Sequence, residues 1–113
     1  MTDRELLEAA AKAAGIDGGY GHLAGQTGII VMKNSGSRLW TGKIWNPLMD
    51  DGDALRLAVQ LKVDVMCARG NVVVRHRKNR ICPPTIHHRT EDACADTRRA
   101  IVRAAAAIGK EMK

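Results

Sequence analysis

The sequence has few aromatic residues and no long hydrophobic run. Its 113 residues include two Trp, one Tyr and no Phe, whereas modules that bind single-stranded nucleic acid stack bases on several aromatic side chains. No apolar stretch approaches the roughly 20 residues of a transmembrane helix. The polar segment 1–5 also lacks the hydrophobic core of a signal peptide. We therefore expect neither a base-stacking module nor a membrane or exported protein.

Cysteine pairs are also missing. The chain contains three Cys, an odd number with wide spacing, which favours free thiols in a reducing cytoplasm. The length predicts a single domain spanning residues 1–113. It excludes a Rossmann enzyme, a (β/α)₈ barrel and a kinase, all of which need a longer chain.

Acidic residues are absent from one long segment of an otherwise balanced chain. The formal net charge is +6, and residues 65–89 account for it with six cations: Arg69, Arg75, Arg77, Lys78, Arg80 and Arg89. Such a basic segment attracts anionic partners. We predict that these six residues form the partner-binding surface. A solvated basic edge that only prevents sheet-to-sheet aggregation is an equally weighted interpretation.

Hydrophobic periodicity and turn residues predict an α+β fold. Helices are expected at residues 3–14 and 52–61 and from residue 90 or 91 to the C-terminal end. Strands are expected at 29–32, 39–45, 63–67 and 72–76, with an irregular or edge strand within 81–88. Six glycines make residues 15–28 a predicted loop. The order predicts an antiparallel sheet of four to five strands packed with two to three helices, an α-β-β-α-β-β-α sandwich.

Several residues carry specific structural predictions. Thr2 and Glu5 have the spacing of a capping box at the first helix. Ile101 lies in the middle of the apolar stripe of the last helix, so we expect it in the core. Cys67 and Cys94 are also predicted on core faces. Trp40 and Trp45 alternate to opposite faces of a strand, which places at least one Trp in the core.

Four patterns could carry chemistry, and each has a simpler explanation. Asp50, Asp51 and Asp53 resemble the start of a calcium loop but lack its distal Glu, so helix capping explains them. The glycine loop could cradle a phosphate, yet no Lys-Ser/Thr pair follows it. Residues of the kinds that bind zinc are present, but they lack the short Cys-Cys and His-His spacings of zinc sites. They are Cys67, Cys82, Cys94, His76, His87 and His88. Cys82 with His87 or His88 could form a catalytic pair, but nothing marks an activated nucleophile. We predict no enzymatic activity, metal or cofactor.

One segment has a distinctive pattern. Residues 45–59, WNPLMDDGDALRLAV, join an aromatic-Asn-Pro strand end to an acidic turn and a helix. With residues 97–105, TRRAIVRAA, the segment resembles the NinX-like phage proteins, a family of small phage or prophage α-β-α sandwich proteins. The chain departs from that pattern after Asp53-Ala54, where those proteins usually continue with Trp-Pro. The resemblance implies a phage or prophage origin and a sandwich fold, without catalytic residues to transfer.

Together these observations predict a small cytoplasmic phage or prophage accessory protein in a bacterial host. Its expected partner is a host or phage protein with an acidic surface, such as a component of host defence or gene expression. Two alternatives remain open: a nucleic-acid-binding protein that uses the basic 69–89 region, and a small nucleotide-binding protein that uses the 15–28 loop. A homodimer is compatible with each.

Overall fold

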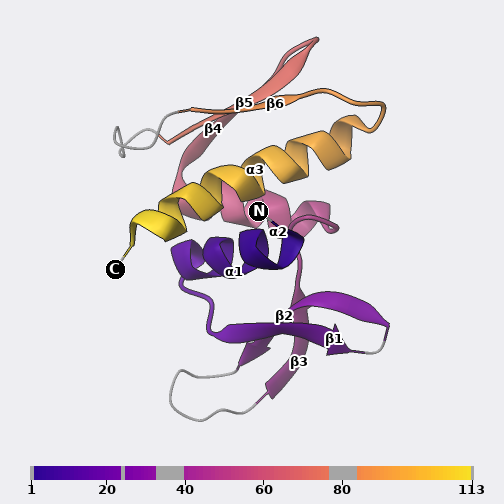
Figure 1. Cartoon of the computed structure of the whole chain (residues 1–113), viewed down its shortest axis with the longest axis vertical. Coiled ribbons are helices and arrows are strands. Elements are labelled where there is room, and N and C mark those ends of the chain that lie inside the picture. The colour runs from indigo at the N-terminus through magenta and orange to yellow at the C-terminus, as the bar shows by residue number, and fades with distance from the viewer. Residues whose placement is uncertain (1, 24, 33–39, 77–83, 113) are drawn as a thin grey trace.

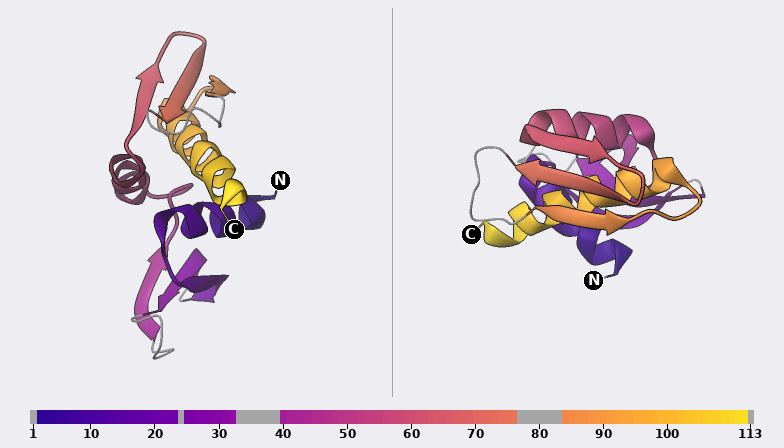
Figure 2. Two further views of the ribbon diagram at one scale, coloured as in Figure 1. Left: turned by 90° about the vertical axis from the view of Figure 1, so that its left-hand side faces the viewer. Right: turned by 90° about the horizontal axis from the view of Figure 1, so that it is seen from above.

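In the computed structural model, which describes residues 2–23, 25–32, 40–76 and 84–112, two small sheets enclose a layer of helices (Figures 1 and 2). Both sheets are antiparallel and three-stranded, with strand orders β1-β2-β3 and β4-β5-β6. The elements are α1 (Asp3–Ala14), β1 (Gly18–Leu23), β2 (Gln26–Met32), β3 (Trp40–Trp45), α2 (Asp51–Leu61), β4 (Val63–Cys67), β5 (Asn71–His76), β6 (Thr85–His88) and α3 (Ala93–Glu111).

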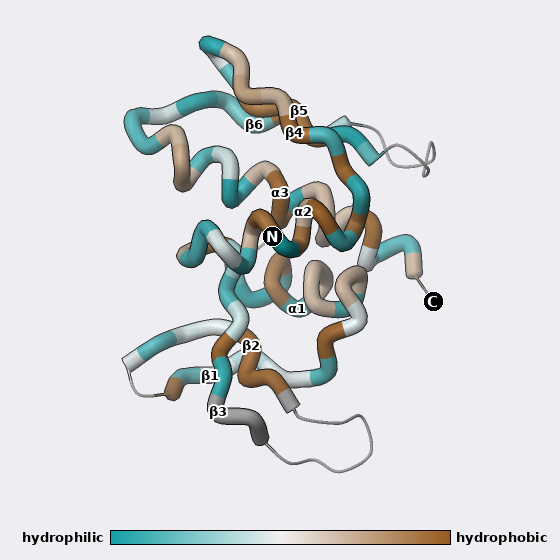
Figure 3. The backbone as a smooth tube through the Cα atoms, turned by 180° about the vertical axis from the view of Figure 1, so that it is seen from behind, coloured by the Kyte–Doolittle hydropathy of each residue, from teal (hydrophilic) through white to brown (hydrophobic). Residues whose placement is uncertain are grey.

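The α+β class and the antiparallel pairing are as the sequence predicts, but the sheet is not single. A sheet of four to five strands was expected, and the strands instead divide between two sheets with the helices in the middle. Each sheet buries one face against the helices, and α3 packs closely on α1. The hydrophobic residues, coloured brown along the tube in Figure 3, accordingly lie on β2, on β4 and β5, and on the helices between them.

The helix boundaries follow from capping side chains. The Glu5 amide donates to Thr2 Oγ1 at 3.2 Å, which confirms the predicted cap, and Gly15 ends α1 in the left-handed conformation with φ of 72°. The Asp53 amide donates to Asp50 Oδ2 at 2.8 Å at the start of α2. Asp92 caps α3, which begins at Ala93, slightly later than predicted.

The predicted glycine loop at residues 15–28 is wrong, because most of it forms the hairpin of β1 and β2. A Cβ atom on Gly18 would overlap the carbonyl oxygen of Ile30 on the paired strand. Gly25 adopts φ of 79° between the two strands, a conformation that favours glycine. Glycine therefore allows close backbone approach and a tight turn here.

The core confirms some residue predictions and corrects others. Ile101 and Trp45 are buried, as expected, while the Trp40 side chain lies outside the described set. Cys67 and Cys94 are exposed free thiols, so their predicted core positions are wrong. Within the described residues, no helix is long and apolar enough to cross a membrane.

Candidate functional site

The predicted basic surface is only partly described by the structure. Arg69 is exposed in the turn between β4 and β5, and Arg75 is exposed on β5. Arg89 has a structural role, because its Nη1 donates to the Ala68 carbonyl at 2.8 Å and its amide to Gly70 at 3.1 Å. The other three predicted residues, Arg77, Lys78 and Arg80, lie outside the described residues.

The second sheet has an apolar row on the face turned away from α3. Met66 pairs with Val73, and Val73 pairs with Ile86, so their side chains lie side by side across three strands. Met66 is 61% exposed and Ile86 is 53% exposed. The alternate residues Val72 and Val74 are fully buried on the opposite face. The row is therefore a solvent-facing hydrophobic strip.

Polar residues surround this strip. Arg75 lies opposite Asp64 at one end, and Asn71 lies opposite His88 at the other. We define the outer face as the residues on this side of the sheet: Asp64, Met66, Asn71, Val73, Arg75, Ile86 and His88. An apolar centre within a polar margin is the usual composition of a protein–protein interface.

A second surface is a cleft of about 320 Å³ bounded by α1, β6 and α3, here called the α3 cleft. Its cations come from one face of α3, because positions four and eleven residues apart fall on one side of a helix. Leu6 of α1 and two alanines of α3 supply apolar walls. The lining residues are Leu6, His87, Arg99, Arg103, Ala106, Ala107 and Lys110.

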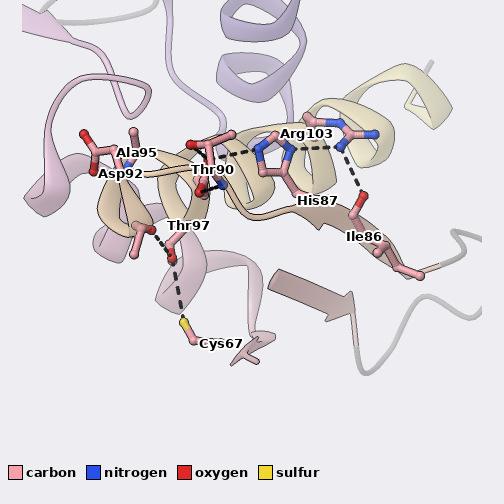
Figure 4. A network of polar contacts seen from close by, with 10 residues as sticks. Cys67, Ile86, His87, Thr90, Asp92, Ala95, Thr97 and Arg103 are labelled. Atoms are coloured by element: carbon pink, nitrogen blue, oxygen red, sulfur yellow. Dashed lines mark hydrogen bonds and ion pairs between the residues drawn. The ribbon is translucent and has the colours of Figure 1, made fainter. Parts of the chain in front are cut away.

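His87 is held at the edge of this cleft by a polar network (Figure 4). Its Nε2 lies 3.4 Å from Asp96 Oδ1, and its Nδ1 lies 3.3 Å from Arg103 Nη1. The Arg103 Nη1 also donates to the Ile86 carbonyl at 3.2 Å. Since Arg103 can only donate, His87 Nδ1 must accept and Nε2 carries the proton toward Asp96. The network thus assigns one neutral tautomer to His87.

Asp96 anchors the network from the interior. Its side chain is 5% exposed, and it accepts from the Thr90 amide at 2.6 Å and from the Thr90 hydroxyl at 2.9 Å. Donation by the Thr90 amide, followed by that of the Thr90 hydroxyl and of His87, holds the pKa of Asp96 below its ordinary value despite the opposing effect of burial. Asp96 is therefore a buried, ionised carboxylate that fixes the position of His87.

The acidic cluster at the start of α2 is occupied by structural contacts. Asp50 caps α2 and Asp51 pairs with Arg98. The buried Asp53 accepts from the Asn46 amide at 3.0 Å and pairs with Arg56 at 2.7 Å. These contacts hold the 45–59 segment as a strand end, a turn and a helix.

The candidate zinc and catalytic residues are not brought together in the described part of the chain. Within that part, no three His, Cys, Asp or Glu side chains lie close enough to hold a metal ion. His87 and His88 alternate to opposite faces of β6, and Cys82 lies outside the described residues. Cys67 instead lies 3.7 Å from the Thr97 hydroxyl, beside Cys94 in a shallow apolar groove between α2, β4 and α3.

The α3 cleft was not found from the sequence. The signal was present as cations spaced by four and seven residues along α3, at Arg99, Arg103 and Lys110. Acidic residues elsewhere in the chain balance these cations in number, so the net charge does not reveal them. No family model, curated protein or solved structure matches this chain.

Proposed function

We propose that this chain is a small non-enzymatic binding protein that docks an acidic protein surface on the outer face of its second sheet. The observation that supports the proposal most is the apolar row of Met66, Val73 and Ile86, in which Met66 and Ile86 are exposed and Val73 is half-buried. Burying such a row against a partner removes apolar surface from water, and each Å² removed contributes roughly 25 cal/mol of favourable free energy. Methionine and Arg are enriched in such interfaces.

The charge near this row favours an acidic partner. Arg75 lies on the outer face and Arg69 at the adjoining turn. In the sequence, three cations, Arg77, Lys78 and Arg80, follow β5 directly. A partner with carboxylates around an apolar patch would complement both properties and would be steered toward this side of the molecule. Asp64, which lies opposite Arg75, would help to fix the orientation in which the partner binds.

A protein partner fits the outer face better than nucleic acid does. Nucleic-acid interfaces are dominated by phosphate contacts, whereas the centre of this face is apolar. From the sequence resemblance to NinX-like phage proteins, we propose that the interaction occurs in the cytoplasm of a bacterial host and that the partner is a host or phage protein.

The test uses two outer-face variants and a matched control. The partner is captured from host lysate, identified and purified, and its affinity is then measured by calorimetry for each variant. Met66→Glu should weaken binding about tenfold or more, as changes to central interface residues do. Arg75→Glu, at the margin, should also weaken binding, because it replaces attraction to the acidic partner with repulsion. The control Val59→Glu changes a valine that is 68% exposed and lies on α2 rather than on the second sheet, and it should bind normally.

Two results would contradict the proposal. Unchanged affinity in both outer-face variants, with unchanged melting curves, would remove the outer face as the binding surface. Capture that disappears after nuclease treatment and weakens steeply with salt would indicate a nucleic-acid partner instead.

A further inference from the structure

We propose that the α3 cleft binds the phosphate group of a small organic phosphate. Within the described residues, Arg103 and Lys110 reach this cleft without a carboxylate partner, while Arg99 pairs with Asp3 at 3.0 Å. Cations gathered on one helix face repel each other, and an anion between them relieves that repulsion. This site is separate from the outer face and does not depend on the protein partner.

Arg103 is oriented before any anion arrives. Its Nη1 contacts two neutral acceptors, the Ile86 carbonyl and His87 Nδ1. A guanidinium has five N–H groups in a planar fork, so donors remain for a ligand. A planar fork fixed in this way suits the two-point binding of a phosphate better than a flexible ammonium does. Lys110, two helical turns further along α3, supplies a second charge.

His87 is a positioning residue in this arrangement. The Nε2–H of His87 donates to the buried Asp96 carboxylate, which leaves the Nδ1 lone pair facing Arg103. His87 therefore presents an acceptor that holds the guanidinium. Among the described residues, the charged groups that contact its ring are Asp96 and Arg103 of α3. Arg99 and Lys110 line the same cleft, to which α1 contributes Leu6, and Asp3 of α1 pairs with Arg99.

The volume of the cleft and the residues that line it limit which organic phosphates can bind. About 320 Å³ is at the lower limit of small-molecule pockets. Leu6, Ala106 and Ala107 offer a small apolar wall, and no Phe, Tyr or Trp is among the described lining residues. A nucleobase would have no aromatic ring on which to stack. The cleft therefore suits a phosphate monoester with a short carbon chain.

The test is calorimetric titration of the full chain with glycerol 3-phosphate at constant ionic strength, beside inorganic phosphate, glycerol and AMP. Glycerol 3-phosphate and inorganic phosphate should bind, and glycerol should not. Arg103→Gln and Lys110→Gln should each weaken binding about tenfold, the effect of losing a charge-assisted hydrogen bond. Lys62→Gln removes an exposed cation beyond α2 and should bind as the parent does.

In ¹⁵N spectra the His87 ring should show the Nε2-protonated tautomer, and its Nδ1 signal should shift when glycerol 3-phosphate is added.

Equal binding by the parent, Arg103→Gln and Lys110→Gln, with all three folded, would overturn the proposal. So would binding of glycerol alone, or a tenfold preference for AMP over glycerol 3-phosphate. The outer-face variants Met66→Glu and Arg75→Glu should titrate normally here, so failure of this site and failure of partner docking are distinguishable.

Discussion

Gly109 sets how closely α3 can approach α1, and replacing it with alanine should destabilise the fold. A Cβ atom at this position would overlap the carbonyl oxygen of Ala9 and lie 2.8 Å from its carbonyl carbon. Backbone atoms of a helix cannot rotate away as a side-chain end can. The two helices must therefore separate, which loosens the alanine-rich contact that joins the layers of the molecule.

The size of the effect follows from two opposing terms. Overpacking a close contact typically costs about 1–3 kcal/mol, and a backbone overlap belongs at the upper end. Alanine is better than glycine inside a helix by about 1 kcal/mol. The net loss in the free energy of unfolding should be about 2 kcal/mol, which corresponds to a melting temperature roughly 8 °C lower in a domain of this size.

The matched control is the same substitution at Gly19, on β1, where an added Cβ meets nothing within 4 Å. Gly19→Ala should be neutral or stabilising by about 0.5 kcal/mol, because it restricts the unfolded chain. Urea unfolding followed by circular dichroism measures both variants. A Gly109→Ala protein as stable as the parent would refute the close crossing of α1 and α3.

Three further predictions concern buried side chains. Ile101→Ala should lower the free energy of unfolding by about 2–4 kcal/mol, measured by urea denaturation, because Ile101 is buried between α3 and its neighbours. Asp53→Ala should cost about 1–3 kcal/mol in the same assay, since it leaves the amide of Asn46 without its acceptor. The lowered pKa of Asp96 means that its ionised form stabilises the fold above the ordinary Asp pKa, and this stabilisation is lost as pH falls through the folded-state value. Melting temperatures of the parent and Asp96→Asn should therefore converge at pH values below about 4, and a constant difference would contradict the assignment.

Local signals predicted the helices well because capping is a local interaction. Thr2, Asp50 and Gly15 act within one turn of the helix ends that they define. The face of α3 was only half predicted. Ile101 is buried at its centre, whereas Cys94 near its N-terminal end is exposed. Periodicity identifies a helix face, but it does not show how far along the helix its neighbours reach.

The first sheet and the α3 cleft depend on contacts between distant segments, which the sequence does not show. Glycines in β1 indicate a loop when they are considered alone, and their strand geometry comes from pairing with β2, as at Gly19 opposite Ile30. The cations of α3 are regularly spaced in the sequence, yet only the approach of His87 on β6 and Leu6 on α1 turns them into a cleft. Neither partner lies near these cations in the chain.

The two proposed surfaces share β6, so only a variant that leaves β6 untouched can change binding at one surface without changing binding at the other. Ile86 points to the outer face and His87 to the α3 cleft, because side chains alternate along a strand. Arg103 contacts both residues, through the Ile86 carbonyl and the His87 ring. Its removal can therefore disturb the outer face as well as the cleft. Lys110 lines only the cleft, so Lys110→Gln should weaken glycerol 3-phosphate binding while partner affinity stays at the parent value. Loss of both in Lys110→Gln would mean that the surfaces act as one site, and the assignment of two separate functions would be wrong.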